Sequence, residues 1–118
     1  MNDDWGWEGS GLWFRGPNNI VRNNVVADTN SFAVTYMMLR VDRVPIPASR
    51  GKEPAVRTNM MAVPLREFSG NEIYASRFGI TIWNLGASCC TEVFEVPEST
   101  FRNTHLWHIG KWGVYGYG

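Results

Sequence analysis

The sequence contains little cysteine and few metal-binding side chains. Its two cysteines are adjacent, Cys89 and Cys90, and two cysteines do not make a disulfide framework. A disulfide between neighbours would be strained, so we expect two reduced thiols. There is no second pair of cysteines, and the two histidines, His105 and His108, lie close together in the sequence. This argues against a zinc site. We therefore predict no metal and no cofactor.

The sequence also lacks an excess of charge and a long apolar run. Lys and Arg number 11 together, as do Asp and Glu, so the formal net charge is zero. Without a net positive field the chain has no general attraction for nucleic acid or an anionic membrane. No apolar run approaches the roughly 20 residues that span a bilayer. The acidic start, MNDDWGWEGSG, has no apolar signal-peptide core, which predicts a cytoplasmic protein or a chain without its leader.

Aromatic residues and glycine are abundant, with six Trp, six Phe, four Tyr and 12 Gly, which favours many turns over long helices. One short strand pattern occurs four times: a small residue precedes alternating apolar residues. The copies are Gly11-Leu12-Trp13-Phe14, Ala33-Val34-Thr35-Tyr36, Gly79-Ile80-Thr81-Ile82 and Gly113-Val114-Tyr115-Gly116. A second pattern precedes the last three copies, at residues 21–27, 68–74 and 101–107. In it an apolar residue is followed three residues later by Asn or Thr, and two residues after that by another apolar residue.

Such a repeat predicts stacked units, because a unit of two or three short strands cannot bury its own apolar side. We predict one all-β domain over residues 1–118, a short parallel β-helix of about three to four coils. If the spacing from Leu12 to Val34 is the length of one repeat without an insertion, the longer spacings between the later copies indicate insertions. We place these two long loops at about residues 37–66 and 85–98, which contain five of the six prolines.

Strand alternation then sorts the side chains into columns. Asn24 and Asn71 are expected to stack at a corner, with Thr104 in the same position of the last unit. The predicted inward columns are Leu12, Val34, Ile80 and Val114; Phe14, Tyr36 and Ile82; Val26, Ile73 and Leu106; and Val21, Phe68 and Phe101. The predicted outward columns are Ala27, Tyr74 and Trp107; Val25, Glu72 and His105; and Trp13, Thr35, Thr81 and Tyr115.

The segments GSGLWFRGPNNIVRNN, REFSGNEIYASRFGITIWN and FRNTHLWHIG resemble the repeats of pectate-lyase-like proteins. More narrowly, they are similar to the β-helix region found with G8 domains, as in hyaluronan-depolymerising cell-migration-inducing proteins. The resemblance covers most of residues 10–118 and implies a right-handed β-helix whose function is to bind or cleave polysaccharide. Those β-helices have many coils, so this chain is expected to be a truncated fragment without a G8 domain.

The outward aromatic residues are the candidate ligand-binding positions. An aromatic column beside carboxylate and imidazole can stack on sugar faces and bond their hydroxyls. The candidates are Trp107, Tyr74, Trp13, Tyr115 and His105. The alternative is that the two insertions fold over these columns and bury them.

Candidates for catalysis are weaker. Lyase chemistry needs a base and a positive charge, for which His105 could act with Arg77 or Arg102. Hydrolase chemistry needs two carboxylates, and Glu72 has potential partners in Glu92, Glu95 and Glu98 without a spacing that brings them together. The Arg-rich insertion at residues 40–57 is either a solvated loop or a contact for an anionic glycan.

Three functions follow from these residues. The leading one is a non-catalytic module that binds carbohydrate. The second is an assembly element without a ligand, and the third is a fragment of a polysaccharide lyase or hydrolase. Because open β-helix ends expose unpaired backbone and apolar core, we also expect a homo-oligomer formed through these ends or an apolar face.

Overall fold

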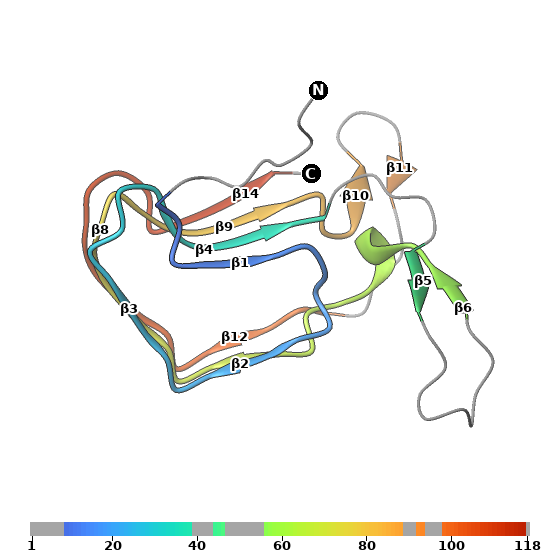
Figure 1. Ribbon diagram of the computed structural model, residues 1–118, viewed down its shortest axis with the longest axis horizontal. Helices are drawn as coiled ribbons and strands as arrows, with labels where there is room; N and C mark the ends of the chain where they lie inside the picture. The colour runs from blue at the N-terminus through green and yellow to red at the C-terminus, as the bar shows by residue number, and fades with distance from the viewer. Residues whose placement is uncertain (1–8, 39–43, 47–55, 89–91, 94–97, 118) are drawn as a thin grey trace.

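The computed structural model describes residues 9–38, 44–46, 56–88, 92–93 and 98–117, and within these ranges the protein is all-β. Seen along its shortest axis, the molecule shows three straight walls with a triangular outline (Figure 1). Each wall is a parallel sheet, and helical structure in the described ranges is one short 3-10 turn, η2 (Met60–Ala62).

Strands that follow one another in the chain belong to different walls. Wall A contains β1 (Leu12–Phe14), β4 (Phe32–Met37), β9 (Phe78–Trp83) and β14 (Val114–Tyr117), in that order. Wall B contains β2 (Ile20–Arg22), β7 (Glu67–Ser69) and β12 (Phe101–Arg102). Wall C contains β3 (Val25–Ala27), β8 (Glu72–Ser76) and β13 (His105–Ile109).

The strands thus form tiers. Tier 1 is β1, tier 2 is β2, β3 and β4, tier 3 is β7, β8 and β9, and tier 4 is β12, β13 and β14. Each strand pairs in parallel with the strand at the same place in the next tier. This arrangement is compatible with a β-helix-like solenoid.

The registers agree with the predicted columns. Val34 pairs with Ile80, Val26 with Ile73, and Val21 with Phe68. The inward residues of tiers 2 and 3 make up the core, where Tyr36, Phe68 and Ile73 are at most 1% exposed. Burial of these apolar side chains is the main stabilising term of the fold. The alternating pattern therefore predicted the core of the three walls.

Left-handed residues form the corners between the walls. Between walls B and C, Asn23, Gly70 and Asn103 have φ angles of 56°, 63° and 47°. Where wall C approaches wall A, the residues that follow the paired Ala27, Tyr74 and Trp107 have φ angles of 49° to 55°: Asp28 directly after β3, and Ala75 and His108 one residue before the ends of β8 and β13. Asn, Asp and Gly accept this conformation most readily, so the sequence meets the backbone demand at most of these positions.

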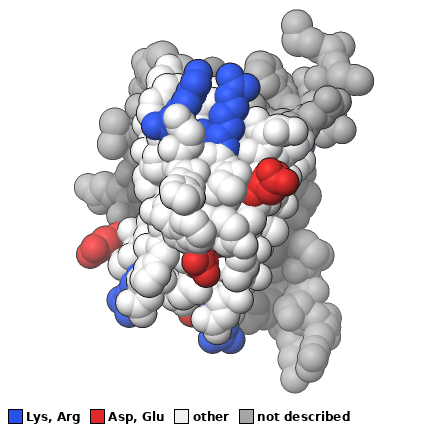
Figure 2. Space-filling view, turned by 90° about the vertical axis from the view of Figure 1, so that its left-hand side faces the viewer, with Lys and Arg blue, Asp and Glu red and all other residues white. Residues whose placement is uncertain are grey.

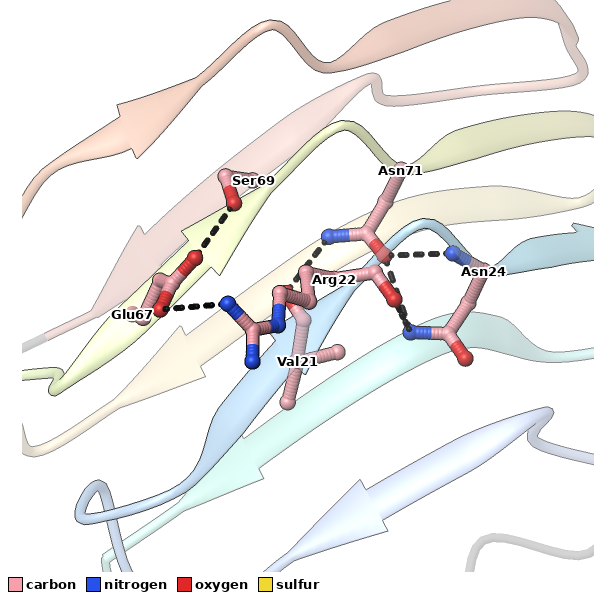
Figure 3. A network of polar contacts seen from close by, with 6 residues as sticks. All are labelled: Val21, Arg22, Asn24, Glu67, Ser69 and Asn71. Carbon is pink, nitrogen blue, oxygen red and sulfur yellow. Dashed lines mark hydrogen bonds and ion pairs between the residues drawn. The ribbon is translucent and has the colours of Figure 1, made fainter.

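The predicted asparagine stack is present and forms a buried network (Figure 3). The Asn71 side chain, in a residue 2% exposed, accepts hydrogen bonds from the backbone N–H and the side-chain Nδ2 of Asn24, both at 3.0 Å. Asn71 Nδ2 donates to the Val21 carbonyl oxygen at 2.9 Å. One side chain therefore links tier 2 to tier 3 where the chain passes between walls B and C.

The small residue near the start of β9, Gly79, has a steric cause. A Cβ atom on Gly79 would overlap the backbone carbonyl oxygen of Gly113 and lie 2.7 Å from Leu106 Cδ2. The same carbonyl accepts the Ile80 N–H at 2.8 Å, so it cannot move aside without loss of a hydrogen bond in wall A. Glycine at position 79 therefore permits close packing of tiers 3 and 4.

Both predicted insertions contain antiparallel strands. In the first, β5 (Val44–Ile46) pairs with β6 (Val56–Thr58), and in the second, β10 (Ala87–Ser88) pairs with β11 (Glu92–Val93). Wall A also continues into the first predicted insertion, because Met37 ends β4 and both Met37 and Met38 are buried. The greater part of the Arg-rich segment, and Cys89 and Cys90, lie outside the described residues.

Burial gives Tyr36 an unusual ionisation, which predicts a loss of stability at high pH. Tyr36 is 0% exposed, its hydroxyl has no hydrogen-bond partner among the described residues, and desolvation raises its pKa to about 12. As the pH rises from about 10 to about 12, the unfolded chain loses this proton before the folded protein does, so the free energy of unfolding falls by about 2 kcal/mol.

Tyr36→Phe should abolish this loss and raise stability at neutral pH by about 1 kcal/mol, because an unsatisfied buried hydroxyl is removed. Urea unfolding of both proteins at about pH 8 and about pH 11 measures the effect. An equal fall in stability for Tyr36→Phe and the original protein would contradict the assignment to Tyr36.

Candidate functional site

The outer face of wall C carries most of the predicted ligand-binding residues. Along β8 and β13, Ile73 and Leu106 point into the core, so Glu72, Tyr74, His105 and Trp107 lie on the opposite side. The register pairs Glu72 with His105 and Tyr74 with Trp107. These are the two outward columns that the sequence predicted, and we call these four residues the aromatic face.

Trp107 is held in place by two contacts. Its ring stacks on Tyr74, with centroids 4.5 Å apart and planes inclined by 14°. Its indole Nε1 donates a hydrogen bond to Glu72 Oε1 at 2.9 Å. Trp107 nevertheless remains 44% exposed. The stacking contact and the hydrogen bond together hold this exposed indole on the outer face of wall C.

Two imidazoles lie beside this indole. His105 is exposed and occupies the column of Glu72, while the His108 ring lies 4.9 Å from the Trp107 ring at 59°. Strict alternation would place residues three apart on opposite faces of a strand. His108 departs from that rule because its φ of 50° interrupts the strand, and both imidazoles are exposed.

A second aromatic stack, which the sequence interpretation missed, stands at the corner between walls C and A. Phe32 stacks on Phe78 at 4.6 Å, and Phe78 stacks on Trp112 at 5.1 Å. Trp112 is 49% exposed. The signal was present in the repeat itself, since an aromatic residue precedes the small residue in Phe32-Ala33, Phe78-Gly79 and Trp112-Gly113.

Two cations accompany this second stack. The Arg77 guanidinium lies 5.3 Å, and Lys111 Nζ 5.8 Å, from the centre of the Phe78 ring. Both side chains are exposed. We call Arg77, Phe78, Lys111 and Trp112 the basic corner. Figure 2 shows the wall C side of the molecule, with basic side chains at its upper and lower edges and a few acidic side chains on the otherwise uncharged surface between them.

The third predicted column, on wall A, is different. Trp13, Thr35, Thr81 and Tyr115 are in register, but Thr35 is 0% and Thr81 1% exposed. Trp13 and Tyr115 are half-buried, and Arg15 lies 5.0 Å from the centre of the Trp13 ring. The middle of this column is interior, so Trp13 and Tyr115 do not belong to one continuous outer surface.

The catalytic candidates are only partly brought together. His105 and Glu72 are register partners, whereas Arg77 follows the end of β8, where the chain turns toward wall A. One oxygen of Glu72 already accepts the Trp107 hydrogen bond. Glu98 lines a groove beside β7 and β12, and Glu95 and the Glu92 side chain lie outside what the structure describes.

That groove beside wall B has a volume of about 580 Å³. Its wall includes Arg66, Glu67, Ser69, Glu98 and Arg102. Glu67 accepts a hydrogen bond from Ser69 at 2.8 Å and lies 3.9 Å from Arg22 (Figure 3). At such exposure this ion pair contributes little to stability. The groove is polar and contains none of the predicted ligand-binding residues.

Among the described residues, no group of three or more His, Cys, Asp and Glu side chains is placed to hold a metal ion. The same part of the chain has no helix that is long and apolar enough to span a membrane.

The chain was compared with known proteins in three ways. No protein-family model matches it, and neither the curated proteins nor the solved structures contain a match.

Proposed function

We propose that this protein is a non-catalytic β-helix module that binds carbohydrate through the aromatic face of wall C. The observation that carries the proposal is the fixed, exposed indole of Trp107. It is stacked on Tyr74 and tied to Glu72, so binding would not have to order it. A sugar ring presents apolar C–H groups to such a surface and hydroxyls to the carboxylate and imidazoles around it.

The proposal includes the finer architecture. We take walls A, B and C as the three sides of a right-handed parallel β-helix of three to four coils. Support comes from the repeated order of the walls and from corner columns that recur at equivalent positions. The relationship to pectate-lyase-like and G8-associated β-helices belongs to this proposal as well.

The charge around the face favours an acidic polysaccharide. Arg77 and Lys111 are exposed at the basic corner, and His105 and His108 are exposed beside Trp107. Trp112 offers a second half-exposed indole next to the cations. A chain with carboxylate or sulfate groups could place a sugar on an indole and an anion near Arg77 or Lys111, an attraction that salt would weaken.

Trp107→Ala should abolish this binding. The test titrates the protein with neutral and acidic polysaccharides and follows tryptophan fluorescence and, independently, retention on immobilised polysaccharide. For the original protein we expect saturable binding of an acidic polysaccharide. Loss of one sugar-stacking indole should weaken that binding by about tenfold or more, which corresponds to about 1.4 kcal/mol.

Ile20→Ala is the matched control, because Ile20 on wall B is 46% exposed and lies away from the aromatic face. It should bind as the original protein does. Glu72→Gln should retain an acceptor for the Trp107 indole while removing the charge, and it separates positioning of Trp107 from electrostatics. Absence of saturable binding across the panel, or equal binding by Trp107→Ala, would reject the proposal.

A further inference from the structure

The two ends of the tier stack differ in exposure. At the tier 2 edge of walls B and C, the inward residues Val21 and Val26 are only 5% and 8% exposed. In tier 4 the inward residue Val114 is 60% exposed, and Leu106 and Phe101 are half-buried. Three outer aromatic residues of this tier are also 44% to 49% exposed: Trp107, Trp112 and Tyr117. Among the described residues, tier 4 therefore exposes more of its apolar side chains than tier 2 does at the edge of walls B and C.

A glycine leaves a hollow in tier 4. Gly116 stands in register with Ile82, in the inward column that begins with Phe14 and Tyr36. A hollow of about 370 Å³ lies here, lined by Ile82, Leu85, Ser99, Phe101, Gly116 and Tyr117. A Cβ atom on Gly116 would meet nothing within 4 Å. An inward position that a side chain normally fills is thus vacant, two residues from an exposed inward valine.

The outer edge of β14 has a definite hydrogen-bonding pattern. The carbonyl oxygens of Gly113 and Tyr117 accept the N–H groups of Ile80 and Asn84, at 2.8 and 2.7 Å, on the β9 side. Because successive residues of a strand point their backbone groups to opposite sides, those of Val114 and Gly116 face away from β9. These two residues can therefore form a hydrogen-bonded pair with another strand.

We propose that a second copy of this chain docks on tier 4 through an antiparallel pairing of β14 with β14, about a two-fold axis at Tyr115. In this register Val114 of each copy lies opposite Gly116 of the other, and both are hydrogen-bonded pairs. Each exposed valine then enters the hollow beside the other copy's glycine. The edge is self-complementary in hydrogen bonds and in shape, as an isologous contact requires.

A head-to-tail stack of copies fits less well. It would place tier 4 against the opposite end, where Val21 and Val26 are already covered. Two copies joined at β14 would instead combine their four-stranded walls A into one continuous sheet. The β14 edge of each copy, otherwise a site of uncontrolled pairing, would then be covered. This proposal concerns the edge of wall A and the tier 4 end, and its test does not use carbohydrate.

Sedimentation equilibrium at micromolar concentration tests the proposal, with three variants. The original protein should be a dimer. Gly116→Val should fill the hollow from within and weaken the dimer by about tenfold or more, and Val114→Gly should leave the hollow empty and weaken it similarly. The exchange of both residues, V114G with G116V, again places a valine opposite a glycine and should restore association.

Unfolding midpoints of all variants establish that they are folded. A monomeric original protein, or an exchange variant no tighter than the single variants, would overturn the proposed register. As an independent measurement, Tyr115→Cys in a background with both native cysteines replaced by serine should form a disulfide-linked dimer on oxidation, because the two-fold axis brings both copies of position 115 together. Ile20→Cys, away from tier 4, should not; equal cross-linking of the two variants would also reject the proposal.

Discussion

Gly79→Ala is expected to lower the free energy of unfolding by about 3 kcal/mol or more. The added Cβ would overlap the Gly113 carbonyl oxygen and approach Leu106 Cδ2 to 2.7 Å. The carbonyl is fixed by its hydrogen bond from Ile80, and Gly79 N–H itself donates to the Trp112 carbonyl at 2.8 Å. Relief of the overlap would therefore separate β9 from β14.

Gly113→Ala is the matched control for this change. Gly113 occupies the next position in the same column, yet the nearest atom to a Cβ there is Leu106 Cδ2, at 3.9 Å. The two variants remove the same backbone freedom and add the same methyl group, so only the overlap distinguishes them. Urea unfolding should show a large loss for Gly79→Ala and less than about 1 kcal/mol of change for Gly113→Ala. Equal losses would show that the spacing between tiers 3 and 4 is not the cause.

Asn71→Ala is expected to lower the free energy of unfolding by about 2 to 4 kcal/mol. The change removes three hydrogen bonds and leaves the Val21 carbonyl and the Asn24 backbone N–H without these partners. Because Asn71 is 2% exposed, water does not readily replace the lost groups.

Asn24→Ala provides the comparison. Asn24 is in the same column but only half-buried, and its side chain donates to Asn71 Oδ1 and to the Arg22 carbonyl. Its removal should cost about 1 kcal/mol, because the backbone N–H of residue 24 still donates to Asn71. Denaturant unfolding of both variants measures the difference. A loss for Asn24→Ala as large as that for Asn71→Ala would contradict the central role of Asn71.

The repeat predicted the walls well, because a parallel ladder forces equivalent residues into register. Alignment of Leu12, Val34, Ile80 and Val114 gave the pairs of wall A, and alignment of the second pattern gave those of walls B and C; the structure has these pairs. The asparagine stack was predictable for the same reason. The direction of the hydrogen bond between the two asparagines was not predictable. Asn71 is the buried acceptor and Asn24 the donor because of local geometry that the pattern does not encode.

The site was predicted less completely, because alternation assigns a side chain to a face without saying what covers that face. It placed Glu72, Tyr74, His105 and Trp107 together on wall C, as the structure does. It placed Thr35 and Thr81 in an outward column and left open whether that column is covered, and both residues are buried. It also missed the stack of Phe32, Phe78 and Trp112, because the repeated strand pattern begins at the small residue and these aromatic residues stand one position before it.

The parallel pairing of the tiers bears on how this chain reaches its fold. Even the parallel ladder with the smallest sequence separation, β1 with β4, joins Leu12 to Val34, and the others join segments further apart in the sequence. No tight turn can start such a ladder, so a long loop must close before the first strand pair is stabilised. The chain should therefore have a high contact order and fold slowly for its length. During folding, a tier that has formed before the next tier has paired with it would be prone to aggregation.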